Sequence, residues 1–386
     1  MLSNGDRGVE FKTFLAWCHD NWPNGFPWAS PISNQERLRI ARACVATHLA
    51  DTDIKPARLL DEIDWCKDCF STKKEYLEAD RAGRGFRLSD SMRQRVYAAI
   101  VQYQQTLDQN QVLDWGDVPR KLWKAVDARQ ATLPQYDAVF IDEAQFFAPY
   151  WFTILKTCLN PETGHLFIVA DPTQGFLKRR LSWLALGIDV RGRSQKLIRS
   201  YRTTQSIMTF ANLLYRDRTP DDAEAILAPD LSGMPTGVMP TVLPLTKPQD
   251  EITRVADEIQ ELLQHGTKPE HILIVHAEPS GVKPMIARLN KQLGKGAADD
   301  PRNTRQRKVV RVCSLDASTG LESPIVFLLG IHKLYEKEQS AYLTEEERAE
   351  LIRTNTRKLY MAITRTGQRL VITYVGVLPP VLEGML

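Results

Sequence analysis

The chain has 386 residues, of which 43% are hydrophobic and 25% charged, an ordinary globular composition with enough length for two or three domains. This composition excludes a disordered or fibrous protein. The formal charge is only +3, from 50 Lys and Arg against 47 Asp and Glu, so the molecule is no polycation and any nucleic-acid binding must come from local patches.

The amino terminus shows no basic stretch followed by an apolar one, and no run of roughly 18 apolar residues occurs in the chain. We therefore expect a cytoplasmic protein without a membrane segment. The six cysteines lie in apolar surroundings, which favours reduced thiols. Cys66 and Cys69 form a C-x-x-C, but no second Cys or His pair lies at zinc spacing, which argues against a metal or redox site.

The first predicted elements are a short strand leading into a helix over 9–18 and a helical block from about 33 to 110. Short apolar runs typical of buried strands follow at 138–141, 165–170, 271–277, 309–315, 324–331 and 369–375. Helical patterns lie between most of them, at 151–159, 206–216, 251–264 and 346–363. This alternation predicts parallel α/β sheets. Segments 227–244 and 294–308, rich in Pro, Gly and charge, are expected to be surface connections.

Acidic and amide side chains follow the first two of these strands. The run "AVFI", expected to be buried on both faces, leads directly into Asp142 and Glu143. One interpretation is a helix N-cap with an acidic first turn. The other is a magnesium ligand beside a water-orienting base at the carboxyl end of a parallel strand. The next strand also ends in a carboxylate, Asp171, followed by Gln174, and two such strands are harder to explain as two caps.

Five segments in chain order resemble motifs two to six of the UvrD/Rep-like superfamily-one helicases: "DEAQ", "ADPTQ", "SYRTT", "STGLES" and "LYMAITR". The segment 9–18 is similar to the family's "TFH" region, and the helical block resembles its insertion. The resemblance covers most of the chain. It implies two RecA-like parallel-sheet lobes, the first incomplete and carrying the helical insertion at about 30–110. The lobes would span 1–190 and 191–386, the second with a short insertion at about 220–305.

The resemblance also implies ATP and Mg²⁺ as cofactors. Catalytic roles fall on Asp142, Glu143, Gln174, Arg202 and Arg365, and nucleotide contacts on Gln145, Asp171, Tyr201, Gly320 and Glu322. Asp142 would hold Mg²⁺, Glu143 would orient the water, and Arg202 and Arg365 would act as arginine fingers. Gln145 and Gln174 would couple the presence of the γ-phosphate to the DNA-binding side. Tyr201 would stack on the adenine, and Glu322 would accept a hydrogen bond from the ribose. Taken singly, Arg202 could be a helix-start cation and Arg365 a surface salt-bridge partner, and Tyr201 and Tyr360 could be core aromatics.

Single-stranded DNA is the partner that the resemblance implies, bound by stacking and backbone contacts. Trp183, just after the basic run at 178–182, is the first stacking candidate, although a Trp is as readily a core residue. Thr13 and Phe14 are the next candidates, and Ser314 in the fifth motif is a further nucleic-acid contact. Further basic runs lie at 191–202 and 302–311, and each could also be a solvated face.

The chain departs from the family in one major respect, because G-x-x-x-x-G-K-[ST], the phosphate-binding loop, does not occur in it. Gly294 and Lys295 form the only "GK", without the earlier Gly or the hydroxyl residue. Asp316 and Thr319 stand where the family usually has His and Lys. Three interpretations remain open: the carboxyl-terminal part of a longer helicase, half of a split motor whose partner carries the loop, or a catalytically inactive scaffold. We expect a DNA-dependent ATPase only where the loop is supplied from an upstream segment or partner.

Overall fold

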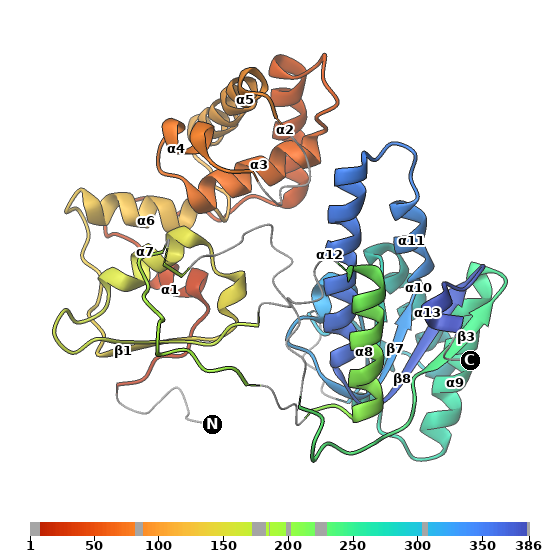
Figure 1. The fold of residues 1–386 in the computed structure, drawn as a ribbon. Coiled ribbons are helices and arrows are strands. Elements are labelled where there is room, and N and C mark those ends of the chain that lie inside the picture. The colour runs from red at the N-terminus through yellow and green to blue at the C-terminus, as the bar shows by residue number, and fades with distance from the viewer. Residues whose placement is uncertain are drawn as a thin grey trace. The chain divides into compact units, whose positions relative to one another are not determined.

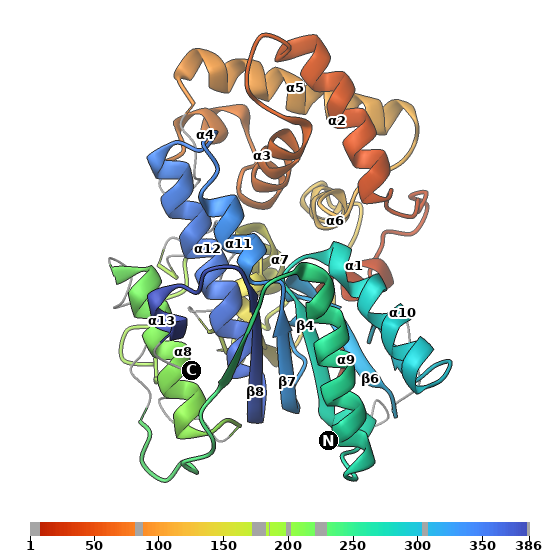
Figure 2. The ribbon, with the colours of Figure 1, turned by 90° about the vertical axis from the view of Figure 1, so that its right-hand side faces the viewer.

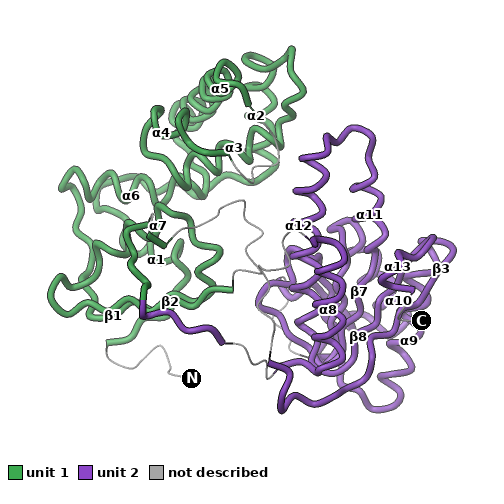
Figure 3. Tube along the Cα trace, viewed as in Figure 1, with its two compact units in different colours: residues 1–82, 87–171, 179–191 green, residues 83–86, 172–178, 192–386 purple. Residues whose placement is uncertain are grey.

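The computed structural model describes residues 8–81, 88–171, 183–184, 186–197, 202–220, 230–302 and 308–383. The chain divides into two compact units (Figure 3). Unit 1 comprises residues 1–82, 87–171 and 179–191, and unit 2 comprises 83–86, 172–178 and 192–386. No helix within the described ranges is long and apolar enough to cross a membrane.

A block of four helices forms one part of unit 1 (Figure 1): α2 (Asn34–His48), α3 (Pro56–Cys69), α4 (Lys73–Glu78) and α5 (Asp90–Gln109). Side-chain oxygens of Ser33, Thr72 and Ser89 cap the first turns of α2, α4 and α5, which fixes where these helices begin. Their apolar faces share one core that includes Leu59 and Tyr103. These helices lie within the stretch from about 33 to 110 that carries the helical pattern.

The other part of unit 1 is a small α/β layer. It contains α1 (Phe14–Asp20), α6 (Asp117–Asp127), β1 (Ala138–Ile141), the 3-10 turn η1 (Ala144–Phe146), α7 (Pro149–Thr157) and β2 (His165–Ile168). β1 and β2 are parallel. Residues 8–13 form no strand, so the strand expected before α1 is absent.

The expectation that β1 is buried on both faces is wrong. Val139 and Ile141 pack into the core with α7, but Phe140 points to the other face and is 75% exposed. Its register partner on β2, Phe167, is 58% exposed, and the two ring centroids are 5.7 Å apart. Both faces of the strand are apolar, so the sequence could not show that only one of them is covered here.

Unit 2 is built on a six-stranded, entirely parallel sheet in the order β3-β8-β7-β4-β6-β5. The strands are β3 (Thr241–Leu245), β4 (Ile272–His276), β5 (Ala298–Asp299), β6 (Val310–Ser314), β7 (Ser323–Leu329) and β8 (Thr366–Val375). The helices are α8 (Gln205–Arg218), α9 (Pro248–Gln264), α10 (Val282–Leu293), α11 (His332–Glu338), α12 (Glu345–Thr364) and α13 (Pro380–Glu383). Short 3-10 turns lie at Pro269–His271, Pro279–Gly281 and Leu315–Ser318.

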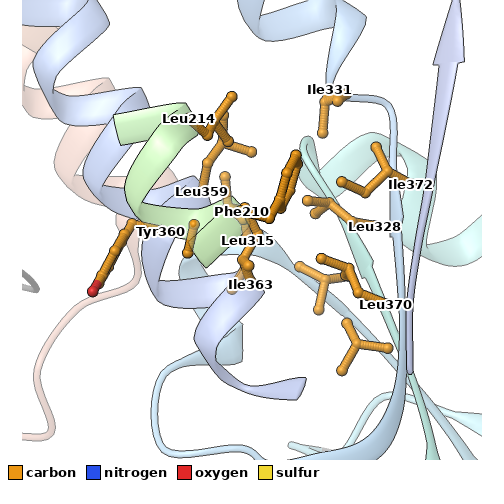
Figure 4. Close-up of a cluster of buried hydrophobic side chains, with 14 of the residues drawn as sticks. Phe210, Leu214, Leu315, Leu328, Ile331, Leu359, Tyr360, Ile363, Leu370 and Ile372 are labelled. Carbon is orange, nitrogen blue, oxygen red and sulfur yellow. The ribbon is translucent and has the colours of Figure 1, made fainter. Parts of the chain in front are cut away.

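Helices cover both faces of this sheet (Figure 2). α9 and α10 pack on one face, in a core that includes Ile259, Met285 and Phe327. α8 and α12 pack on the other, where Phe210 and Leu359 meet residues of β7 and β8 (Figure 4). A parallel sheet covered on both faces is the α/β, RecA-like arrangement expected for the lobes, and the fold class is confirmed.

One expectation for unit 2 is overturned. The stretch at about 220–305 is not an insertion, because it supplies β3, β4 and β5 to the sheet. β3 begins within the stretch 227–244 that was expected to be a surface connection, and β5 lies within the other such stretch, 294–308. Pro244 disguises β3 in the sequence, but β3 is the edge strand of the sheet, and an edge tolerates the missing N–H of a proline.

Candidate functional site

Two carboxylates stand at the carboxyl end of β1. Asp142 is exposed, and its Oδ1 accepts a hydrogen bond of 2.9 Å from the backbone N–H of Glu143. Glu143 has a φ of +55°, the left-handed conformation that residues other than glycine seldom adopt, and it directly precedes the turn η1. Such a conformation costs roughly 1 to 3 kcal/mol and persists only where its surroundings enforce it.

Gln145 connects the ends of β1 and β2 through hydrogen bonds of its side chain. It is buried, its Nε2 donates to the Glu143 carboxylate, and its Oε1 accepts from the backbone N–H of Asp171 at 2.9 Å. Because one partner is an acceptor and the other a donor, the orientation of the amide is fixed. The backbone N–H of Ala144 also donates to the carbonyl of Val169 at 2.9 Å. The ends of β1 and β2 are thus joined by side-chain and backbone bonds.

The carboxylates at this end of the sheet suit a Mg²⁺ ion that takes a single ligand from the protein. No group of three or more His, Cys, Asp or Glu side chains that could hold a metal occurs in the portion of the chain described. Mg²⁺ commonly binds through one or two carboxylates and completes its shell with phosphate oxygens and water. Asp142, exposed beside Glu143, could serve as such a single ligand.

In unit 2, three of the expected site residues line one cavity of about 760 Å³. The guanidinium of Arg202 forms an ion pair of 2.7 Å with the carboxylate of Glu322, and both side chains are exposed. Arg365 is buried at the end of α12, and its carbonyl accepts from the backbone N–H of Ser323 at 3.1 Å. The cavity therefore lies where β7 and β8 begin. Guanidinium groups beside a carboxylate can bind an anion and hydroxyl groups together.

The loop from β6 to β7 carries the fifth motif. Gly320 has a φ of +76°, which a side chain would strain. Ser314 is buried at the end of β6. The two residues that depart from the family both contact α12: Asp316 pairs with Lys358 at 2.5 Å, and the Thr319 hydroxyl donates to the sulfur of Met361 at 3.4 Å. These contacts hold the loop against the helix.

Gln174 and Tyr201 lie outside the described residues. The expected DNA-contact residues of unit 1 are less accessible than the sequence suggested. Thr13 caps α1, accepting from the N–H of Ala16 at 3.3 Å. The Phe14 ring is buried in the core, 4.8 Å from the ring of Trp151, so a base could not stack on it as it stands. Trp183 is half-buried and meets Phe152 edge-on at 5.7 Å, which leaves part of its surface open.

Three of the described arginines in the basic runs are engaged within the protein. Arg191 pairs with Asp189 at 2.7 Å, and Arg302 pairs with Asp300 at 2.6 Å. Arg311 donates to two backbone carbonyl groups, and burial lowers the pKa of its guanidinium. Most of the run at 178–183 lies outside the described residues.

Thr203, Ser323 and Arg369 are among the residues of the cavity wall that were not predicted as site residues. The first two directly follow the expected site residues Arg202 and Glu322 and lie within the quoted segments "SYRTT" and "STGLES", which was the available clue. Arg369 pairs with Glu258 at 2.5 Å, a relationship across unit 2 that no local pattern indicates.

Comparison with known proteins agrees with the motifs. Residues 18–180 match the family described as the UvrD/REP helicase N-terminal domain. Over this stretch the chain is similar to the UvrD/Rep helicases. YjcD of Bacillus subtilis (strain 168), provisionally assigned as an ATP-dependent DNA helicase, is 23% identical over 215 residues, which are 53% of this chain and 27% of YjcD. DNA helicase II of Haemophilus influenzae is 23% identical over 190 residues, 46% of this chain and 25% of that protein.

The chain thus spans about a quarter of the length of each of these two helicases. Among solved structures, it is similar to the C-terminal domain of a possible DNA helicase from Lactobacillus (strain WCFS1), with 18% identity and a TM-score of 0.33. That likeness covers 48% of this chain and 94% of the other.

Proposed function

We propose that this chain is the motor portion of an ATP-dependent helicase or translocase of the UvrD/Rep type that acts on single-stranded DNA. The observation that carries the proposal is the bridge made by Gln145 between Glu143 and the backbone of Asp171. A residue whose two side-chain ends are bonded to a base and to the neighbouring strand end can transmit a change at the nucleotide to the second motif.

The chemistry follows from these groups. Phosphoryl transfer needs a metal ligand, a positioned water and cations for the charge that grows on the γ-phosphate. Asp142 would hold Mg²⁺, and Glu143 would orient the water, with its carboxylate direction set by Gln145. Arg202 and Arg365 would supply the positive charge from unit 2. In this proposal Tyr201 and Glu322 contact the base and sugar, and Gln174 acts beside Gln145.

The phosphate loop would come from another segment or a partner chain, since the motif does not occur in these 386 residues. The exposed face of β1 and β2 supports this part of the proposal. Phe140 and Phe167 are two large apolar side chains side by side in water, and the described sheet has only two strands. Further strands or a helix would normally cover such a face. We propose that the loop-bearing segment packs there.

For DNA, Trp183 is the stacking residue that we favour over Phe14, because part of its ring surface is open. Single-stranded DNA should bind better than duplex, and its affinity should fall steeply with salt. Replacing Trp183 with Ala should cost roughly 1 to 3 kcal/mol of binding free energy if a base stacks on the ring. Unchanged affinity would assign Trp183 to the core.

The deciding experiment is an ATPase assay with single-stranded DNA, on this chain alone and with a loop-bearing segment fused upstream or added. We expect almost no turnover from the chain alone, turnover on completion, and its loss in Glu143→Gln. Glu162→Gln removes an exposed carboxylate of the same unit and should change nothing. Robust turnover by the chain alone would place the phosphate site elsewhere. Absence of turnover in every completed form would favour a catalytically inactive DNA-binding scaffold.

A further inference from the structure

A buried histidine stands where β7 leads into α11. His332 is the first residue of α11 and is only 3% exposed. Neither of its two ring nitrogens has a hydrogen-bond partner among the residues that the structure describes. Native proteins pair nearly all of their buried polar groups, so this ring is unusual. It meets the ring of Tyr374 edge-on, with the two centroids 6.1 Å apart, and is thus held by packing rather than by hydrogen bonds.

A second imidazole packs at the same edge of the sheet. His276 ends β4, and it pairs in register with Leu329 at the end of β7. Backbone encloses its ring: a Cβ at Gly281 would lie 2.1 Å from the Nε2 of His276, and a Cβ at Gly330 would lie 2.6 Å from its Cε1. Neither position has room for a side chain while the ring stays in place. The joint from β4 to α10 and the joint from β7 to α11 therefore both pack against His276.

The surroundings of His332 favour its neutral form. The Glu251 carboxylate is buried and already engaged, because its Oε1 accepts from the N–H of Gly330 at 2.9 Å and from the hydroxyl of Thr373 at 2.6 Å. Burial lowers the pKa of His332 below its ordinary value of 6.5, and the attraction of Glu251 does not outweigh it. The titratable groups that face His332 are Glu251 from α9, His276 from β4, Lys333 and Glu336 from α11, and Tyr374 from β8.

We propose that His332 is a proton-sensitive switch: in its neutral form α11 closes on the sheet, and protonation opens the joint between β7 and α11. An imidazolium carries two N–H donors and a positive charge. In the closed joint both donors would stay unpaired and the charge would be kept from water, which is costly. In an open joint water satisfies both donors. This inference does not depend on the proposed function, and His332 lies outside the five helicase-like motifs.

Opening of this joint would reach α8 through α11. Arg218, at the end of α8, forms an ion pair of 2.6 Å with Glu338 at the end of α11, and both side chains are buried. The same guanidinium lies 4.2 Å from the ring centroid of Tyr335, also on α11. Displacement of α11 would expose Arg218 to water and remove both contacts. Since α8 begins three residues after Arg202, acid would loosen the helix that follows the fourth motif.

The test is backbone hydrogen exchange on the full chain, read by mass spectrometry at about pH 7.5 and about pH 5.5 and corrected for the intrinsic effect of pH. An exposed imidazole changes from about 10% to about 90% charged between these values. If the closed joint stays neutral, the open population should therefore rise about tenfold, and exchange over residues 330–338 should rise with it. In His332→Phe and His332→Gln, which cannot take up this proton, the pH response should disappear.

His271→Gln is the matched control, since His271 is exposed in the same unit and its loss should leave the response at 330–338 intact. Nuclear magnetic resonance on the unaltered chain needs no variant: the His332 ring should be neutral at about pH 6, where an ordinary imidazole is mostly charged. The proposal would be overturned by equal exchange at both pH values or by a charged His332 ring in the folded chain at about pH 6. It would also be overturned by a response that persists in both His332 variants or disappears in His271→Gln.

Discussion

The ammonium group of Lys67 lies 2.9 Å from a carboxylate oxygen of Asp114, and both side chains are buried. Asp117 is 2.8 Å from the same ammonium group and is also buried. Lys67 belongs to α3 of the helical block and Asp117 to α6 of the α/β layer. This ionic cluster therefore joins the two parts of unit 1.

Replacing Lys67 with Met should destabilise unit 1 by about 3 to 5 kcal/mol, because Asp117 and Asp114 lose a buried ammonium group and Asp114 keeps only Arg37, at 3.5 Å. Urea unfolding followed by circular dichroism measures this change. Lys74→Met is the control, since Lys74 forms an exposed pair with Glu78 at 4.0 Å and its loss should stay within about 0.5 kcal/mol. A loss of similar size in both variants would contradict a structural role for the cluster.

Acid should weaken the same cluster. Burial alone would raise the pKa of Asp114, but Lys67 and Arg37 outweigh it and hold the pKa below its ordinary value of 3.8. A carboxyl group with a lowered folded-state pKa stabilises the protein above its unfolded pKa, and this contribution is lost as the pH falls through the folded value. The unfolding free energy should therefore decline below about pH 4. Asp114→Asn should remove part of that decline, whereas Asp108→Asn, at an exposed pair with Lys121, should not.

The bridge at Gln145 predicts a local change that needs no activity to detect. Gln145→Met removes the acceptor for the Asp171 N–H, so that this amide should exchange its hydrogen at least about tenfold faster. In the loop-completed chain, the DNA-stimulated ATPase rate should fall with it, since Glu143 loses its donor. Gln135→Met, whose amide donates to a surface carbonyl, is the control. Unchanged exchange at Asp171 would show that the bridge does not hold the strand end.

The exposed phenylalanines of β1 and β2 predict that one substitution can abolish binding of the loop-bearing segment and leave the stability of the chain unchanged. Replacing Phe140 and Phe167 together with Ser should change the unfolding free energy of the chain alone by less than about 1 kcal/mol, because both rings already face water. The same double variant should no longer bind the loop-bearing segment or gain ATPase activity from it. Tyr342→Ser, at a residue that is 96% exposed in unit 2, should retain both. Full activation of the double variant would remove this face from the proposal.

The sequence was sufficient to predict strands alternating with helices and the placement of Asp142 and Glu143 at a strand end, because both depend on local pattern and on the geometry of parallel sheets. The sequence could not predict the bridge made by Gln145, since that contact depends on the left-handed conformation of Glu143 and on the neighbouring strand. β3 escaped because Pro244 is tolerated only at a sheet edge, and edge position is a property of the whole sheet. The cavity wall likewise joins segments distant in the chain.

The backbone of Glu143 has a consequence for how this protein can vary. A glycine at this position would relieve the left-handed strain and should stabilise the chain by about 1 kcal/mol, while it removes the carboxylate that would orient the water. Folding alone would therefore favour losing Glu143. Under the proposed function, a glutamate at this position is a stability–activity trade-off, and related chains without an ATPase role should drift toward Gly or Asn here.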